Sequence, residues 1–526
     1  MVQVDRPEGG SAPPKRTPAD RGWSLDITAS GRLGAILSAT LLVSALAPAA
    51  TFAAGYDPAT DVNSMYNTTA YSGATAWWNA GYTGAGVDVA LIDTGVSPVE
   101  GLATPGKIIY GPDLSLESQA AELRNLDTNG HGTFMAGLIA GRDSDVTAPY
   151  AGSPATAYRG MAPDARIVSL KVGVADGGTD VSQVIAAIDW VVQHKTDGDL
   201  NIRVINLSYG TDSTQGYEVD PLAYAVEQAW KAGIFVVAAT GNEGYVRRTG
   251  SLTNPAYDPT ILAVGASDSM GTATLLDDKV AAFSSTGSPS RYVDVVAPGS
   301  HIVGLRVPGS YVDQTYGATG YISDRYFRGS GTSEAAALVS GAAALAIQKF
   351  PSIDPLTLKW LFRSNTQQLS TSQSIQGQGE INLWQMLLAS PFTKKGSLPK
   401  ASTGTGTLEG ARGTEHLTRD GIVLSGEQDI FGHAFDSAAM AVLEAQGSSW
   451  SGGTWNGSSW SGSSWSGSSW SGSSWSGSSW SGSSWSGSSW SGNSWSGSSW
   501  SGSSWSGSSW SGSSWSGNSW STATWS

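Results

Sequence analysis

The chain of 526 residues contains no cysteine. This absence excludes disulfide bonds, thiolate metal sites and a cysteine nucleophile. Charged residues are also scarce, at 14% of the chain, and the net charge is −14. An acidic balance gives no electrostatic footprint for nucleic acid and no attraction to anionic lipid head groups. We therefore expect no nucleic-acid partner, and packing must supply most of the stability.

One long uncharged run lies near the start of the chain. Residues 33–54 are mostly apolar, and they are preceded by basic residues that include Lys15, Arg16, Arg21 and Arg32. Basic residues, an apolar core and then small residues are typical of a secretory signal peptide. The run is barely long enough to span a bilayer, so a membrane anchor is the lesser alternative, and Pro48 favours cleavage. We expect residues 1–54 to direct export, leaving the protein secreted or attached to the outer cell envelope.

Residues 55–390 have the composition of a globular domain in which short apolar segments alternate with helical patterns. Six segments rich in Val and Ile suit parallel strands buried on both faces: 87–93, 165–172, 204–210, 234–240, 261–267 and 293–298. Asp180, Asp220 and Asp354 are positioned to cap helices, the last two with proline at the first helical position. The alternation predicts an α/β fold with a doubly wound sheet, whose site lies beyond the carboxyl ends of the strands.

The composition changes after about residue 390. Residues 391–446 are polar and rich in glycine, which indicates a linker or a small accessory module. Residues 447–526 contain no charge, and tryptophan recurs at every fifth position from Trp450 to Trp525. Successive tryptophans would rotate by about 140° on a helix and would alternate faces on a strand, so neither gives a stripe. We interpret this tail as a flexible low-complexity segment, with the hypothesis that its indoles stack on cell-wall glycans or self-associate.

Three short segments contain the residues of a serine nucleophile system: 92–95 (IDTG), 130–133 (GHGT) and 331–333 (GTS). A serine hydroxyl needs a neighbouring imidazole to take its proton and a carboxylate to orient that imidazole. Ser333 also begins an apolar helical pattern, so backbone N–H groups and the positive end of the helix dipole would face a developing oxyanion. Each segment alone is a common turn, loop or helix opening; their occurrence together on one α/β pattern favours catalysis.

These segments resemble motifs of the subtilases, the subtilisin-like serine proteases. Residues 79–95 resemble the first family motif, 129–140 the histidine motif with Phe134 where a second histidine is usual, and 331–341 the serine motif. The resemblance covers about residues 70–388. It implies a subtilisin-like three-layer sandwich with a mostly parallel central sheet, followed by the linker and the tail. It also implies a serine endopeptidase acting on proteins or peptides, with Asp93, His131 and Ser333 as the catalytic triad.

Two further segments resemble family motifs with known roles. Residues 238–244 are similar to the segment whose asparagine completes the oxyanion hole, which implies that Asn242 and the Ser333 backbone N–H bind the oxyanion. Residues 206–210 are similar to a strand that pairs with extended substrate. The substrate-binding residues implied are Ser208, Tyr209, Gly210 and Gly241. The chemistry needs no cofactor, and although many relatives bind structural calcium, the sequence identifies no calcium site.

The sequence departs from the family at two places. Glu334 occupies a position where the family usually has methionine, and its carboxylate would either repel the oxyanion or point aside and contact the leaving-group residue; we favour the second. The lead-in from Gly55 to about Ala70 leaves no room for the usual inhibitory propeptide domain. These departures keep an alternative open, in which a degenerate subtilase scaffold binds the cell envelope through its tail.

Overall fold

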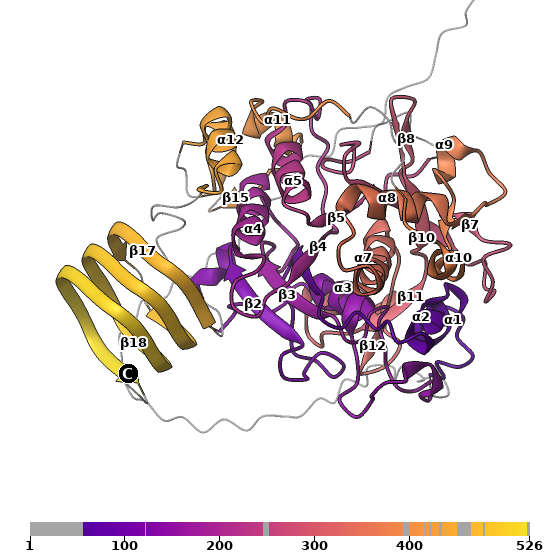
Figure 1. Ribbon diagram of the computed structural model, residues 1–526, viewed down its shortest axis with the longest axis horizontal. Coiled ribbons are helices and arrows are strands. Elements are labelled where there is room, and N and C mark those ends of the chain that lie inside the picture. Colours follow the sequence, from indigo (N-terminus) through magenta and orange to yellow (C-terminus); the bar gives the residue numbers. More distant parts are fainter. Residues whose placement is uncertain are drawn as a thin grey trace, which may run out of the picture. The chain divides into compact units, whose positions relative to one another are not determined.

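The computed structural model describes residues 56–120, 122–245, 252–392, 399–414, 416–419, 422–430, 434–449, 464–476 and 479–522 (Figure 1). The predicted signal peptide lies outside these residues. Among the described residues, no helix has both the length and the hydrophobicity needed to cross a bilayer.

A mostly parallel sheet forms the centre of the fold. Its order is β13-β14-β10-β6-β5-β4-β1-β3-β2, with β7 paired to β6. All neighbours are parallel except for the pairs that involve β7 and β13. The strands are β1 (Asp88–Asp93), β2 (Ile108–Asp113), β3 (Arg166–Lys171), β4 (Ile202–Leu207), β5 (Phe235–Ala239), β6 (Leu262–Asp268), β7 (Lys279–Val280), β10 (Val295–Pro298), β13 (Thr366–Gln367) and β14 (Glu380–Ile381). The predicted apolar segments thus do form the buried strands.

Helices cover both faces of this sheet (Figure 1). One hydrophobic cluster joins the sheet to α1 (Met65–Tyr71), α2 (Ala74–Asn79), α3 (His131–Ala140), α7 (Thr332–Lys349), α8 (Pro355–Ser364) and α10 (Leu383–Leu388). A second cluster joins the opposite face to α4 (Val181–His194) and α5 (Pro221–Lys231). The three layers confirm the predicted α/β architecture.

The helix starts follow the predicted capping chemistry. The Asp180 carboxylate accepts a hydrogen bond from Ser182 N in a capping box with Gln183 at the start of α4. Asp220 caps α5, and Asp354 caps α8 in the same way, each with a proline at the start of its helix. Side-chain acceptors at these positions satisfy backbone N–H groups that the first helical turn leaves without partners.

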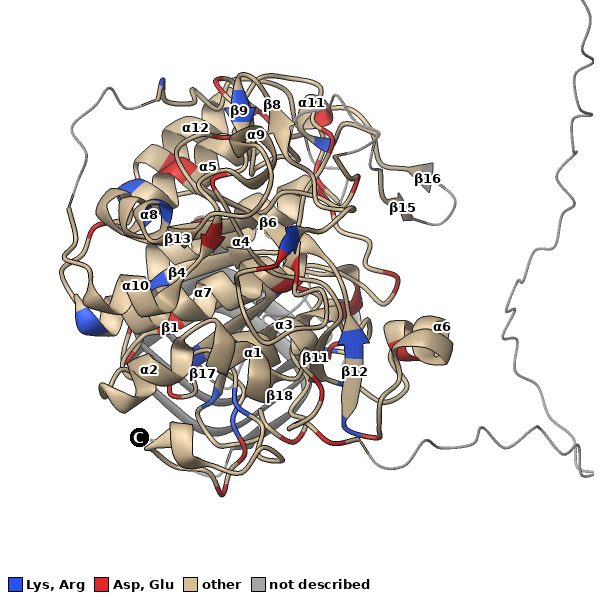
Figure 2. Cartoon of the chain, turned by 90° about the vertical axis from the view of Figure 1, so that its right-hand side faces the viewer, with Lys and Arg blue, Asp and Glu red and all other residues tan. Residues whose placement is uncertain are grey.

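A small antiparallel pair lies beside the layer that contains α3. Strand β11 (Ile302–Leu305) pairs with β12 (Tyr326–Gly329), and α6 (Tyr311–Gly320) connects them at the edge of the molecule (Figure 2). On the face in Figure 2, basic residues lie among acidic ones. Further short elements are η1 (Leu116–Gln119), η2 (Tyr150–Gly152), β8 (Gly287–Ser288), β9 (Arg291–Tyr292), α9 (Gln373–Gln376), β15 (Thr418–Arg419) and β16 (Ile422–Val423).

The segment predicted as a linker or accessory module contributes to the second hydrophobic cluster. Helices α11 (Leu408–Arg412) and α12 (Ser437–Ala445) contact α5, and α11 also contacts α4. Arg412 is fully buried and pairs with Asp180, with 2.6 Å between Nε and Oδ2. Helices α11 and α12 therefore pack on the same core as the α/β domain.

The tail contains two described strands, β17 (Ser464–Ser476) and β18 (Ser479–Thr522). Their backbones pair in parallel, with Trp465 opposite Trp485 and Trp470 opposite Trp490. The offset, from 465 to 485, is 20 residues, or four pentapeptides, so each residue type pairs with its own kind. The flexibility expected of the tail stays a prediction.

Candidate active site

The predicted site residues gather where several elements end or begin. Asp93 is the last residue of β1, Ser208 follows the end of β4, and Asn242 follows β5 after a short turn. Because β4, β1 and β5 are parallel neighbours in the order β5-β4-β1, their carboxyl ends share one edge of the sheet. Helices α3 and α7 pack against each other (Figure 1), and they begin with His131 and with Thr332 followed by Ser333.

Asp93 and His131 form a hydrogen-bonded pair. The distance between Asp93 Oδ1 and His131 Nδ1 is 2.8 Å. The Asp93 side chain is 4% exposed and the His131 side chain is 31% exposed. Burial opposes protonation of His131, but the charge and hydrogen bond of Asp93 outweigh it and raise the pKa of His131 to about 9. An imidazole held through Nδ1 offers its Nε2 as a base.

The carboxylate of Asp127, which was not predicted from the sequence, holds the turn before His131. Asp127 Oδ1 accepts hydrogen bonds from Thr94 Oγ1 at 2.8 Å and Gly130 N at 2.7 Å, and its Oδ2 accepts from Thr133 N at 2.7 Å. Asp127 thus serves as a cap for α3, whose own N-cap, Gly130, has no side chain. Helix caps are predicted from the residue directly before a helix, which here is Gly130. The only sequence signal for Asp127 is its short distance from His131 along the chain.

Asn242 is fixed by the residue before the predicted nucleophile. Its Oδ1 accepts hydrogen bonds from Thr332 N at 2.9 Å and from Thr332 Oγ1 at 3.1 Å, and Gly241 N donates to Thr332 Oγ1 at 3.2 Å. Because the amide oxygen is occupied, the Nδ2 donor is left to face elsewhere. A Cβ atom on Gly331 would lie 3.3 Å from Asn242 Nδ2 and 3.6 Å from Ser333 N. Both predicted oxyanion donors therefore border one small space beside Gly331.

The strand predicted over residues 204–210 is shorter than expected. Strand β4 ends at Leu207, so Ser208, Tyr209 and Gly210 lie beyond the last sheet pairing rather than within the strand. Ser208 leaves the ladder and donates from its Oγ to Ser333 O at 3.2 Å. A Cβ on Gly210 would come within 2.6 Å of the Thr253 side chain, so glycine is required there. Ser208 thus lies next to Ser333, and the role of the segment in substrate binding stays a prediction.

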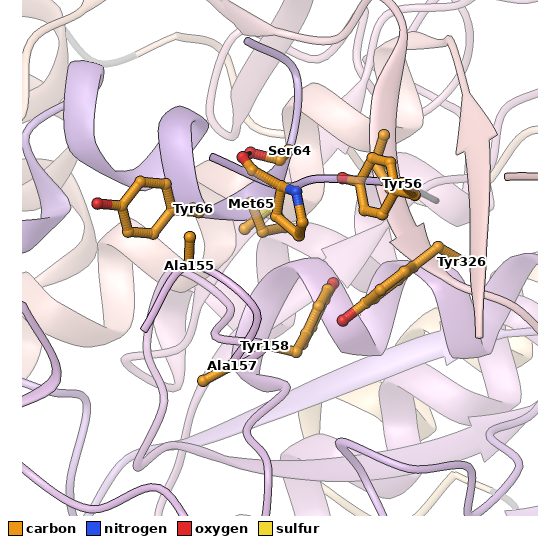
Figure 3. Close-up of a pocket in the computed structure, with 10 residues that line it drawn as sticks. Tyr56, Ser64, Met65, Tyr66, Ala155, Ala157, Tyr158 and Tyr326 are labelled. Atoms are coloured by element: carbon orange, nitrogen blue, oxygen red, sulfur yellow. Dashed lines mark hydrogen bonds between the residues drawn. The ribbon is translucent and has the colours of Figure 1, made fainter. Parts of the chain in front are cut away.

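The described residues contain no group of three or more His, Cys, Asp or Glu side chains that could hold a metal ion. A small pocket lies away from the site. Its lining includes Tyr56, Tyr158 and Tyr326, and none of the predicted site residues (Figure 3). The ring centroids of Tyr56 and Tyr326 are 5.4 Å apart, so Tyr56, at the start of the described residues, packs against β12.

An Asp–His pair, a serine at the start of a helix and an amide donor, brought together on an α/β fold, are the catalytic groups of a serine hydrolase. A family model described as "Subtilase family" matches residues 84–379. Serine protease AprX of Bacillus subtilis is 36% identical over 308 residues, which cover 57% of this chain and 66% of that protein. Subtilisin DY of Bacillus licheniformis is 32% identical over 303 residues, which cover 58% of this chain and 91% of that protein. 

One solved structure, of a cold adapted subtilisin-like serine proteinase, aligns with 57% of this chain and 88% of that chain, at 29% identity and a TM-score of 0.41. The family model and the sequence relatives decide the assignment. The chain belongs to the subtilase family. It is a serine endopeptidase, with proteins or peptides as substrates.

Proposed function

We propose that this chain is an exported endopeptidase that hydrolyses peptide bonds through an acyl-enzyme on Ser333. The observation that supports this most is the 2.8 Å hydrogen bond between Asp93 and His131, at the sheet edge where α7 begins with Thr332 and Ser333. Its mechanism follows from the roles that these groups have in serine hydrolases.

The first step transfers the acyl group to the enzyme. Ser333 Oγ forms a bond to the substrate carbonyl carbon, its proton passes to His131 Nε2, and the carbonyl π electrons move to oxygen. Asp93 keeps the imidazole oriented and stabilises the imidazolium. When the tetrahedral intermediate collapses, the C–N bond breaks and His131 returns the proton to the leaving amine. Water then repeats the sequence and releases the acid.

The oxyanion would be stabilised by two donors. Asn242 Nδ2 and Ser333 N border the same space beside Gly331, and Thr332 fixes the amide so that its nitrogen is available. Preorganised donors of this kind need no reorganisation during the reaction. The backbone of Ser208, Tyr209 and Gly210, with Gly241 opposite, would bind the substrate chain before the scissile bond.

The protein would be exported, and its chemistry would need no cofactor. Residues 1–54 have the order of a signal peptide, with a membrane anchor at 33–54 as the lesser option. Bound calcium, if the protein takes it up, would act on stability rather than on the chemistry.

A second function is favoured by the tail. Sixteen tryptophans at five-residue spacing suit stacking on sugar rings, so the protein would bind cell-wall glycans and concentrate the protease at the envelope. In the alternative that the sequence left open, envelope binding by the tail is the whole function, and the subtilase domain is only a degenerate scaffold.

Hydrolysis of an unfolded protein separates these functions. We expect the full chain to cleave fluorescently labelled casein and Ser333→Ala to be inactive while folding normally. Casein left intact by folded wild type would favour the scaffold. In parallel, we expect deletion of residues 447–526 to release the protein from isolated envelope fractions, and unchanged retention would count against glycan binding.

A further inference from the structure

Glu334 is a buried acid directly after the proposed nucleophile, and the mechanism above gives it no role. Glu334 is 6% exposed. It occupies the third position of α7, after Thr332 and Ser333, where a glutamate commonly reaches back to the N-cap N–H. Here that N–H belongs to Gly331 and donates to Gly299 O at 2.8 Å. The capping box therefore does not form, and the Glu334 carboxyl group accepts a hydrogen bond from its own backbone N–H instead.

The carboxyl group of Glu334 lies at the space that the oxyanion donors border. A Cβ on Gly331 would lie 2.7 Å from Glu334 Oε2, as well as 3.3 Å from Asn242 Nδ2 and 3.6 Å from Ser333 N. The other carboxyl oxygen lies against Gly329 at the end of β12. This position is beside the oxyanion, as in the first alternative raised by the sequence, in which a carboxylate would repel the oxyanion, and it does not support the favoured alternative of contact with the leaving-group residue.

The charge state of Glu334 decides whether it helps or opposes catalysis. Burial raises the pKa of Glu334, the charge of His131 on α3 and a hydrogen bond from the backbone N–H of Glu334 itself lower it, and the charge of Asp93 on β1 raises it. Arg328 on β12 pairs with Asp61, at 2.5 Å between Nη2 and Oδ2, rather than with Glu334. A carboxylate would repel a developing oxyanion, whereas a neutral carboxyl group in an apolar site can donate a hydrogen bond to it.

We propose that Glu334 is a further catalytic residue, whose protonated carboxyl group donates a third hydrogen bond to the oxyanion beside Asn242 and the Ser333 N–H. This inference rests on the proposed function, because the oxyanion arises only when Ser333 attacks a carbonyl carbon. Glu334 keeps its proton through the cycle, and His131 alone accepts and returns the proton of Ser333. Loss of the Glu334 proton turns a donor into a repelling charge.

Two variants of the full chain separate donation from mere space filling. Glu334→Gln keeps a neutral donor of similar shape, and Glu334→Leu keeps the volume without a donor. The readouts are kcat and KM for an internally quenched peptide that wild type cleaves, from pH 6 to 10, and the rate of inactivation by a fluorophosphonate. Thermal unfolding confirms that each variant is folded.

We expect Glu334→Leu to lower kcat by roughly a hundredfold at neutral pH, with KM within about twofold, since one oxyanion donor is lost. Glu334→Gln should stay within about threefold of wild type at neutral pH, and a decline in kcat that the proposal expects of wild type when Glu334 loses its proton should be absent from it. Glu227, 2% exposed on α5, gives the control: Glu227→Gln should leave the profile unchanged.

Folded Glu334→Leu with the wild-type kcat would overturn the proposal, and so would Glu334→Gln falling as far as Glu334→Leu. If Glu334→Leu does not fold, the pH profile of Glu334→Gln decides alone: an alkaline decline identical to that of wild type overturns the inference. Inactive wild type would instead remove the proposed function and this inference with it.

Discussion

At the residue scale, the Asp93–His131 pair determines the pH at which the site can react. His131 must be neutral to accept the Ser333 proton, and its pKa is raised to about 9. A raised pKa in the folded protein means that the base is blocked by protonation at lower pH and becomes available as pH rises through that value. The same pair stabilises the fold below the unfolded histidine pKa and loses that contribution above about 9.

We predict that kcat/KM rises with pH up to about 9 and that Asp93→Asn moves this limb to lower pH while reducing kcat by about 10⁴. The amide removes the charge that favours the imidazolium and no longer selects the correct tautomer. Kinetics from pH 5 to 10 on both proteins measure the shift. A wild-type limb near the ordinary histidine value of about 6.5 would contradict the prediction.

Asn242 provides the second residue-scale prediction. Asn242→Leu removes the Nδ2 donor, and we expect kcat to fall by roughly a hundred- to a thousandfold with a much smaller change in KM. Thr332→Val is the matched control, because it removes only the hydroxyl bonds to Asn242 and Gly241 and keeps the donor itself. It should lose clearly less kcat. Equal losses in the two variants would assign the effect to the turn instead of the donor.

At the element scale, the sequence predicted helices and strands well where one local signal sufficed. Asp180, Asp220 and Asp354 cap the expected helices because each carboxylate sits directly before its helix. Asp127 was missed because it caps α3 from outside the cap position, through a turn that exists only when folded. The strand expected to reach Gly210 stops at Leu207 because Ser208 bonds to Ser333, far away in sequence.

The packing of α12 on the domain could not be predicted from sequence, and it buries an acid. Burial, with a contribution from Asp189 on α4, raises the pKa of Glu444 to about 10. A carboxyl group with an ordinary pKa when unfolded and a raised pKa when folded stabilises the fold less as pH increases. The loss runs from the unfolded value of about 4.3 up to about 10.

Glu444→Gln should therefore increase the free energy of unfolding at pH 8 and change it little at pH 4. Urea unfolding of both proteins at the two pH values measures this difference. Glu122→Gln, at an exposed position, is the control and should have no effect at either pH. A Glu444→Gln effect that is the same at pH 4 and pH 8 would contradict the assigned cause.

At the scale of the whole molecule, the globular body extends further than the subtilase motifs. The motif resemblance ends near residue 388, yet Leu408, Ala411 and Phe435 lie in the cluster with α4 and α5. Polar, glycine-rich composition concealed this because few apolar residues make the contact. Gln193 Nε2 also donates to Ser449 O at 3.0 Å, which fixes the end of the segment.

Two truncations test this boundary. A chain ending at Ser449 should keep the thermal midpoint and peptide kcat/KM of the full chain. A chain ending at residue 390 should unfold at a lower temperature, because it exposes the α4–α5 surface and leaves the buried Asp180 without Arg412; breaking such a pair costs about 3 to 5 kcal/mol. Equal midpoints for the two truncated chains would refute the structural role of residues 391–449.

Covalent trapping of the nucleophile tests the central claim most directly. The full-length protein is treated with a fluorophosphonate, and the adduct is located by peptide mass spectrometry. A serine activated by His131 and held at the start of α7 should be modified, and the adduct should be on Ser333. Labelling should be lost in Ser333→Ala and strongly slowed in His131→Ala. Folded wild type that stays unlabelled, or an adduct on another serine, would contradict the account.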